Sequence, residues 1–182
     1  MGFVKGMDVS MAKALEAHGA SYYLDGKQDD LFRILKKCGT DMIRLRIWPD
    51  PYDASGAPYG GGNNDLQTTV ELAQRAKSSG MEVLLDFQYS DFWADPAKQI
   101  KPKAWKSLAG KELETAVYLH TRETLKYLKN RGIIPAMVQV GNEITNGFLW
   151  PDGHVKNLAA MAGLLQAGIY AVKEECPEAR IV

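Results

Sequence analysis

The sequence predicts an α/β fold of the (β/α)8 barrel type, of which residues 1–182 supply about the first four βα units and the start of the fifth strand. Two observations lead to this prediction. Short β-rich runs alternate with runs of helical period along the chain, which is the pattern of parallel strands joined by helices. Polar residues gather where the predicted strands end, and barrel enzymes build their sites at that end. We therefore interpret residues 1–182 as one unit, the N-terminal half of a barrel.

Five runs of sequence are typical of strands, because they are short and rich in apolar and β-branched residues. The first four are FVKGMDVS, MIRLRIW, MEVLLDF and MVQVGNE, and the closing ARIV opens a fifth. The first strand should end at Asp8 and the second at Pro49. A helical run separates each strand from the next, so we expect the strands to be parallel.

Four runs predict the connecting helices. They are DDLFRILKKCG, NDLQTTVELAQRAKSSG, KELETAVYLHTRETLKYLKNRG and VKNLAAMAGLLQAGIYAVKEEC. Asp65 is the expected N-cap of the second helix. Gly39, Gly80 and Gly132 should end the first three, because glycine readily adopts the left-handed C-cap conformation. The expected apolar stripe of the fourth helix consists of Leu158, Met161, Ala162, Leu165, Ile169 and Val172.

Parallel strands with connecting helices also occur in doubly wound sheets, which leaves a small-molecule enzyme of that class as an alternative. Two features favour the barrel. The first strand is not followed by a glycine-rich phosphate-binding turn. The long connections, residues 49–64, 89–110 and 144–154, all follow strands, whereas the connections that precede strands are tight. Long loops at the carboxyl ends of the strands are the site-forming loops of a barrel.

Composition argues against several classes of function. Acidic and basic residues balance at 22 each, so no excess positive charge attracts nucleic acid or an anionic membrane. No apolar stretch of about 18 residues predicts a transmembrane helix. The first residues lack the pattern of a signal peptide, although a chain whose leader had been removed would look the same. Cys38 and Cys176 lack the spacing of metal ligands, so we expect two small buried side chains, no metal and no cofactor.

Two arginines on the second strand indicate a polar interior. Side chains alternate along a strand, so Arg44 and Arg46 share one face while the apolar residues between them share the other. The apolar face should pack against helices, which points both arginines into the barrel. Buried arginines need acidic or hydrogen-bonding partners, and Asp8 and Asp86 end the flanking strands. For Arg44 a structural ion-pair network and a functional role are both open; Arg46 lies nearer the mouth, where a substrate contact is favoured.

The fourth strand ends in a carboxylate. By alternation Gln139, Gly141 and Glu143 share a face, with Glu143 at the mouth. A carboxyl in a walled pocket favours its protonated form, which suits a general acid. Asn142, directly before it, can donate its amide to a sugar hydroxyl. Glu143 is therefore the candidate catalytic residue.

Tryptophans accompany these polar groups. Trp93, Trp105 and Trp150 lie in or beside loops at the same end of the predicted strands. Sugar faces rich in C–H bonds pack on aromatic rings, so tryptophans beside carboxylates and amides are typical of a sugar-binding cleft. A single tryptophan is more often part of a core. The candidate substrate-binding residues are Asp8, Arg46, Gln88, Trp93, Asn142 and Trp150.

Several longer motifs make the chain recognisable. They are KGMDVS, RLRIWPDP, YGGGNNDL, LLDFQYSDFWADPAKQ and VGNEITNGFLWPDG. With these motifs the chain resembles the arabinogalactan endo-β-1,4-galactanases of glycoside hydrolase family 53, which have a (β/α)8 barrel. The resemblance implies an extracellular, retaining enzyme that cleaves internal β-1,4-galactosidic bonds in galactan. It implies that Glu143 is the acid/base, that Asn142 contacts the sugar beside the scissile bond, and that Arg46 and Trp93 line the cleft.

The chain departs from the family pattern in two ways. Gln88 stands where the family usually has histidine, and glutamine can form hydrogen bonds but cannot carry charge. The family nucleophile is a glutamate at the end of the seventh strand, which lies outside residues 1–182. The late residues Glu174, Glu175 and Glu178 belong to the fourth helix and its exit, away from the mouth. We therefore expect very weak hydrolysis by this chain alone.

Two interpretations follow from the missing nucleophile. The chain is either part of a longer galactanase, or a non-catalytic galactan-binding or self-associating half-barrel. Half a barrel exposes two sheet edges and an uncovered inner face, and both favour association. We therefore expect the 182 residues to form a homodimer, to pair with a complementary half-barrel, or to be only marginally stable.

Overall fold

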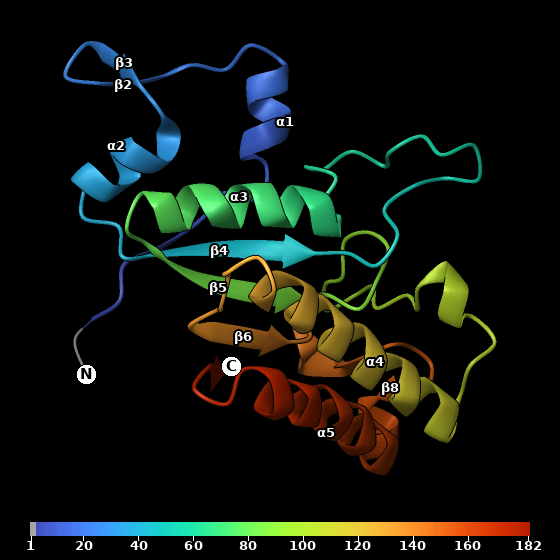
Figure 1. Ribbon diagram of the computed structural model, residues 1–182. Helices are drawn as coiled ribbons and strands as arrows, with labels where there is room; N and C mark the ends of the chain where they lie inside the picture. Colours follow the sequence, from blue (N-terminus) through green and yellow to red (C-terminus); the bar gives the residue numbers. More distant parts are fainter. Residues whose placement is uncertain (1–2) are drawn as a thin grey trace.

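The computed structural model describes residues 3–182, which form a curved parallel sheet with helices along its outer face (Figure 1). Five strands pair in the order β1-β4-β5-β6-β9. Their bounds are Gly6–Asp8 for β1, Met42–Ile47 for β4, Glu82–Phe87 for β5, Met137–Val140 for β6 and Arg180–Ile181 for β9. Every pairing is parallel, so the predicted parallel order is confirmed, including the strand that opens at the chain's last residues.

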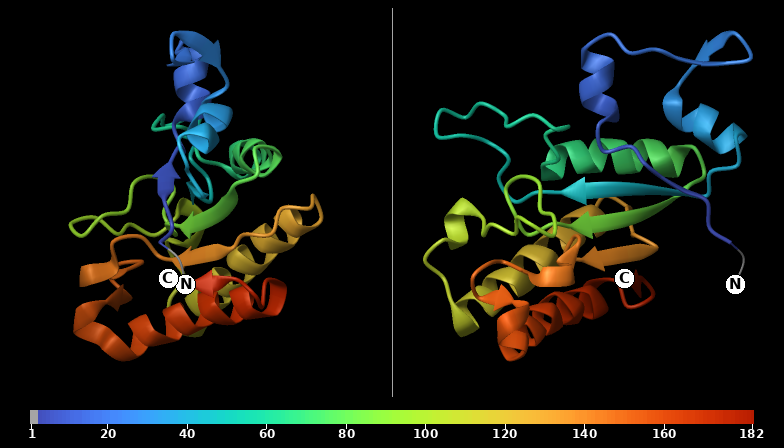
Figure 2. Two further views of the ribbon diagram at one scale, coloured as in Figure 1. Left: turned by 90° about the vertical axis from the view of Figure 1, so that its left-hand side faces the viewer. Right: turned by 180° about the vertical axis from the view of Figure 1, so that it is seen from behind.

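Three long helices cover the outer face of the sheet: α3 (Leu66–Ser78), α4 (Gly110–Lys129) and α5 (Leu158–Glu175) (Figure 2). Helix α3 begins where the sequence predicts, because the Asp65 carboxylate accepts the backbone N–H of Thr68 at 2.7 Å. The helix predicted near the N-terminus is α2, Leu31–Lys37, capped by the Asp30 carboxylate. Helix α1 (Ala12–Ala17) was not predicted.

Small elements complete the fold. Strands β2 (Tyr22–Leu24) and β3 (Lys27–Asp29) form an antiparallel hairpin, and β7 (Gly147–Phe148) pairs with β8 (Gly153–His154) after β6. Short 3₁₀ turns cover Lys103–Trp105, Ile144–Asn146 and Val155–Asn157. As predicted, the long connections follow β4, β5 and β6, so all three lie at the carboxyl end of the sheet.

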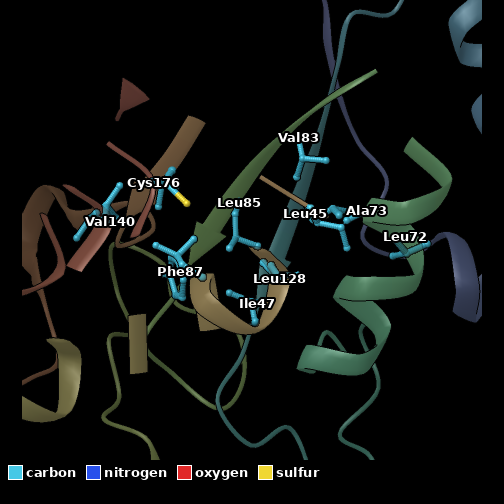
Figure 3. Close-up of a cluster of buried hydrophobic side chains, with 14 of the residues drawn as sticks. Leu45, Ile47, Leu72, Ala73, Val83, Leu85, Phe87, Leu128, Val140 and Cys176 are labelled. Carbon is cyan, nitrogen blue, oxygen red and sulfur yellow. The ribbon is translucent and has the colours of Figure 1, made fainter. Parts of the chain in front are cut away.

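The core lies between the sheet and the outer helices (Figure 3). Strands β4 and β5 supply Leu45, Ile47, Leu85 and Phe87, each at most 1% exposed. Leu72 and Ala73 of α3, Leu128 of α4 and Val140 of β6 close over them. Cys176 belongs to the same cluster, as predicted. Cys38 does not: it follows the last turn of α2 and is exposed, so that prediction was wrong.

Helix α5 buries a face that overlaps the predicted one. Of the expected stripe, Val172 is buried, and Met161, Leu165 and Ile169 are partly buried against the core. Leu158 is 68% exposed, and Ala162 is also exposed. The buried positions are Leu164, Gly168, Ala171 and Val172. A Cβ at Gly168 would lie 2.7 Å from Val140 Cγ1 and 2.8 Å from the Tyr89 hydroxyl. The glycine therefore permits the helix to approach β6 closely.

Helix α5 with its preceding 3₁₀ turn, Val155–Glu175, is the one described segment long and apolar enough to cross a membrane by length and composition. That test is weak evidence, since core helices also meet it. Here α5 packs along α4 and contacts β6 and β8, and 22% of the 18-residue window that meets this test is buried.

Candidate active site

A network of charged and amide side chains lies on the inner face of the sheet, on the side opposite the helices. Its centre is Arg44 of β4, which donates to Asp8 Oδ2 at 2.6 Å and to Asp86 Oδ2 at 2.7 Å. The same guanidinium donates to Asn142 Oδ1 at 2.8 Å. The predicted partners of Arg44 are confirmed. One arginine thus ties β1, β5 and the end of β6 together, because its planar fork presents several donors at once.

Asp86 is the deepest acid of this network, with a side chain that is 0% exposed. Burial raises the pKa of Asp86 to about 6, and the positive charge of Arg44 opposes that rise. Its carboxylate also accepts from Gln88 Nε2 at 3.3 Å. Asp86 therefore joins the sheet to the residues that follow β5.

Gln88 is buried and has protein partners on both ends of its amide. Its Oε1 accepts from Trp48 Nε1 at 2.8 Å and from the backbone N–H of Ala94 at 3.2 Å. An amide can accept two hydrogen bonds and donate to Asp86 at the same time, so Gln88 holds the loop after β5 against the sheet. The structure thus places this predicted substrate-binding residue beneath the mouth. Trp48, which the sequence analysis did not single out, is its partner.

Arg46 lies nearer the carboxyl end of β4 and is also buried. Its Nε donates to Asn64 Oδ1 at 3.1 Å, and its Nη2 donates to the Gly61 carbonyl at 3.4 Å. The guanidinium carbon lies 4.1 Å from the centre of the Trp93 ring, within the range of a cation–π interaction. Arg46 therefore brings together the loops after β4 and β5, and Trp93 is only partly buried beside it.

The chain turns sharply after β6, and this turn presents Glu143. Strand β6 ends at Val140, and Gly141 has a φ of +92°. Glu143 is left-handed, with φ 49° and ψ 46°, a conformation that costs a residue with a Cβ about 1–3 kcal/mol. Strand alternation stops before Glu143, so the prediction that Gln139, Gly141 and Glu143 share one face was wrong. The Glu143 residue is exposed, so the described residues do not wall its carboxyl as expected.

Asn142 is buried, and its side chain is held on three sides. Its Oδ1 accepts from Arg44 and, at 3.3 Å, from Gln139 Nε2, while its Nδ2 donates to the Ala94 carbonyl at 2.7 Å. Because the amide has four hydrogen-bonding positions, one N–H is left for a further partner. The residue before Glu143 is thus fixed by the inner-face network.

A buried glutamine that sequence reasoning missed links the remaining site residues. Gln99, in the loop after β5, donates from Nε2 to the Asn142 carbonyl at 2.8 Å and to the Glu143 carbonyl at 3.5 Å. The backbone carbonyl of Gln99 accepts the backbone N–H of Trp150 at 2.7 Å. The Trp150 indole is partly exposed and donates to the Asn146 carbonyl at 3.1 Å. The one sequence signal for Gln99 is its place at the end of the motif LLDFQYSDFWADPAKQ.

Trp105 is not part of this site. It is buried and packs near Tyr89 and His120 on the outer side of the sheet. Of the three tryptophans expected at the mouth, Trp93 and Trp150 remain candidates, and Trp105 belongs to the core. The other predicted residues occupy the carboxyl end of one sheet, with Asp8, Asp86 and Asn142 joined directly through Arg44.

Residues 4–182 match the model of the family described as glycosyl hydrolase family 53. An endo-β-1,4-galactanase of Bacillus subtilis (strain 168) is 46% identical over 173 residues, which are 94% of this chain and 39% of that protein. The solved Ignisphaera aggregans GH53 catalytic domain is 51% identical with a TM-score of 0.95, over 98% of this chain and 50% of that one.

A second solved structure extends the likeness of fold. A chain from a study of two fungal β-1,4-galactanases is 36% identical with a TM-score of 0.89, over 98% of this chain and 52% of that one. The chain therefore spans about half the length of the relatives it matches. Its parallel sheet and outer helices correspond to half of the (β/α)8 barrel of these structures, which confirms the predicted fold class.

Proposed function

This chain belongs to glycosyl hydrolase family 53, and we propose that it contributes the acid/base side of a retaining endo-β-1,4-galactanase. One observation carries the proposal. Glu143 is an accessible carboxyl at the carboxyl end of β6, directly after an asparagine that the inner-face network holds in place. Catalytic groups of barrel enzymes lie at this end of the strands.

The proposed chemistry uses Glu143 twice. As an acid it protonates the glycosidic oxygen while the bond from that oxygen to the anomeric carbon breaks. As the resulting carboxylate it takes a proton from water, which attacks the anomeric carbon of the glycosyl-enzyme and releases the sugar. The remaining N–H of Asn142 and the face of Trp93 hold the sugar on either side of this exchange.

The nucleophile comes from outside residues 1–182 in this proposal. A retaining glycosidase needs a second carboxylate about 5–5.5 Å from the first. Asp8 and Asp86 are carboxylates at strand ends, but both are ion-paired to Arg44. An attacking carboxylate must be free to form a bond to carbon, so these two acids serve the network instead.

The proposed substrate is inferred from a galactanase relative and from the aromatic rings of Trp93 and Trp150. The Bacillus subtilis relative carries the name endo-β-1,4-galactanase, and we extend β-1,4-galactan to this chain as the proposed substrate. The partly exposed rings of Trp93 and Trp150 suit the C–H faces of galactose units. Galactan is a polymer, so we place the enzyme outside the cell, where such a substrate is available.

A non-catalytic galactan-binding or self-associating half-barrel remains the second candidate. The inner face of the sheet favours this second candidate, because the Arg44 and Asp8 side chains stay 28% and 31% exposed and can contact a sugar or a second copy of the chain. Sedimentation of the 182-residue chain at several concentrations measures self-association. A dimer that binds galactan and stays inactive when completed would favour this candidate over the enzyme.

The direct test is hydrolysis of β-1,4-galactan by a completed barrel. Residues 1–182 are joined to the unmatched part of the Ignisphaera aggregans domain, and release of reducing ends is measured. We expect turnover by the fusion and little by the chain alone. Glu143→Gln should lower the rate by about 10²–10⁴-fold, whereas Glu178→Gln, an exposed acid after α5, should leave it unchanged. An active fusion that tolerates Glu143→Gln would contradict the proposal.

A further inference from the structure

The backbone of Glu143 is in a conformation that its surroundings must hold. Its φ of 49° and ψ of 46° place it in the left-handed region, which residues with a Cβ seldom occupy. The direction of a side chain from the main chain is set by these two dihedral angles. Whatever fixes them therefore also fixes where the Glu143 carboxyl can reach.

Gln99 contacts both peptide groups that define those angles. Its Nε2 lies 2.8 Å from the Asn142 carbonyl oxygen and 3.5 Å from the Glu143 carbonyl oxygen. The first carbonyl belongs to the peptide unit before the Glu143 Cα, and the second belongs to the unit after it. A single amide nitrogen thus draws both carbonyls to one side, as a left-handed residue requires. The shorter of these two hydrogen bonds is the stronger.

Gln99 is itself held firmly. It is 1% exposed, and its backbone carbonyl accepts the backbone N–H of Trp150 at 2.7 Å. The turn before it is closed by reciprocal backbone hydrogen bonds between Asp95 and Lys98, at 2.8 and 3.0 Å. Asn146 Nδ2 donates to the Pro96 carbonyl at 2.9 Å. The segment that carries Gln99 is therefore fastened to the chain after Glu143 at two points.

Other groups hold the residue next to Glu143. The Asn142 side chain is fixed by Arg44, Gln139 and the Ala94 carbonyl, without help from Gln99. Loss of the Gln99 amide should consequently release the Glu143 backbone while Asn142 and the inner-face network stay in place. The two effects, on the acid and on the sugar contact, are separable by mutation.

We infer that Gln99 is a positioning residue that aims Glu143 at the glycosidic oxygen. The inference rests on the proposed function of Glu143 and deepens it. A misaimed acid slows formation of the glycosyl-enzyme only when the leaving group needs a proton. A leaving group that departs as a stable anion needs no such help, so kcat/KM for its substrate, which reports this first step, is insensitive to the aim of Glu143.

The experiment compares two substrates in the active fusion described above. Galactan has a sugar leaving group that must be protonated, whereas dinitrophenyl β-galactobioside releases a stable phenolate. For Gln99→Met, which keeps the length of the side chain but removes the donor, kcat/KM on galactan should fall about tenfold to a hundredfold. On the dinitrophenyl substrate it should change less than about threefold.

A matched control separates positioning from simple loss of stability. Thr121→Val removes a buried hydroxyl of α4, a helix on the outer face of the sheet, that bonds to Tyr89 and to the Val117 carbonyl. It should lower the melting temperature and change both substrates by the same factor. An equal loss on both substrates in Gln99→Met, or no loss on either, would overturn the inference.

Two further measurements test the inference if Gln99→Met does not fold or if the unmutated fusion is inactive. If Gln99→Met does not fold, Gln99→Asn keeps an amide that is one methylene too short, and the same substrate-dependent loss is expected. A crystal structure of the folded variant of the 182-residue chain reports the φ of Glu143 directly. A value still near +49° without the Gln99 donor would overturn the inference. An inactive unmutated fusion would count against the proposed function instead, and this φ value would then decide the inference alone.

Discussion

The two faces of the central sheet differ in how completely this chain covers them. On the outer face, Leu45, Leu85 and Val138 are at most 1% exposed beneath the helices. On the inner face, Arg44 joins Asp8, Asp86 and Asn142, yet Arg44 and Asp8 remain partly exposed. Asp86 Oδ1 is buried there without a hydrogen-bond partner among residues 3–182. Hydrophobic packing against the helices therefore covers the outer face. The inner face is held together by ion pairs and hydrogen bonds, so the comparison separates two kinds of stabilising interaction.

Each side of the sheet also holds a buried titratable group. On the outer side, His120 Nε2 is buried without a hydrogen-bond partner among residues 3–182, and burial lowers the pKa of His120 to about 4. On the inner side, burial raises the pKa of Asp86 to about 6. Both shifts favour the neutral form. For a base and an acid, these shifts have opposite consequences for the pH dependence of stability.

The largest loss of stability should come from a cavity in the core between the sheet and the outer helices. Phe87→Ala removes a ring that is 0% exposed and lies 5.7 Å from the Tyr89 ring. The lost burial and the remaining cavity should lower the free energy of unfolding by about 3–5 kcal/mol. Urea unfolding of the chain measures this change, with the exposed Phe3→Ala as the control. A loss below about 1 kcal/mol would show that the outer core is not close-packed.

Breaking the inner network should cost somewhat less. Arg44→Met leaves the fully buried Asp86 without its cation, and a broken buried pair costs about 3–5 kcal/mol. Because Arg44 is partly exposed, we expect about 3 kcal/mol, at the lower end of that range. The double variant Arg44→Met/Asp86→Leu should recover much of the loss, since no charge is then buried alone. Equal losses in the single and double variants would contradict this account.

The smallest effects should appear as opposite pH dependences. Between about pH 4 and 6 the folded state binds more protons at Asp86 than the unfolded state does, so its contribution to stability falls as pH rises. At His120 the unfolded state binds more protons between about pH 4 and 6.5, so its contribution falls as pH drops. The slope of either contribution is at most about 1.4 kcal/mol per pH unit.

Two substitutions separate these contributions. The stability of the unmutated chain minus that of Asp86→Asn should decrease from pH 4 to 6. The corresponding difference for His120→Phe should increase over the same interval. Urea unfolding at a series of pH values gives both differences. Slopes of the same sign would mean that the two faces do not differ electrostatically as described.

Much of the fold and part of the site could be predicted from the sequence. Strand alternation paired Arg44 with Asp8 and Asp86, because side-chain direction along a regular strand follows from position alone. The Asp65 cap is likewise a local signal. Glu143 could be located at the mouth but not oriented, because its left-handed backbone depends on contacts from a distant loop.

Two features that the sequence analysis missed, Gln99 and Gly168, depend on nonlocal packing. Gln99 lies 43 positions before Asn142 and meets it only when the loop after β5 folds back. Gly168 of α5 is buried because the helix approaches Val140 and Tyr89 closely there, and a search for apolar side chains does not identify such a position. Local turn chemistry was also overlooked: Asp25 and Gly26, with φ of 51° and 75°, form the two-residue turn of the β2–β3 hairpin.

The measurement that tests the account most directly is chemical rescue of Glu143→Ala in the completed barrel by azide, with dinitrophenyl β-galactobioside as substrate. If Glu143 is the acid/base, the glycosyl-enzyme still forms, and azide attacks it in place of activated water. The rate should then rise with azide, and the product should be the β-galactosyl azide, with retained configuration. An α-galactosyl azide would mean that Glu143 is the nucleophile, and an undiminished rate without azide would mean that it is neither.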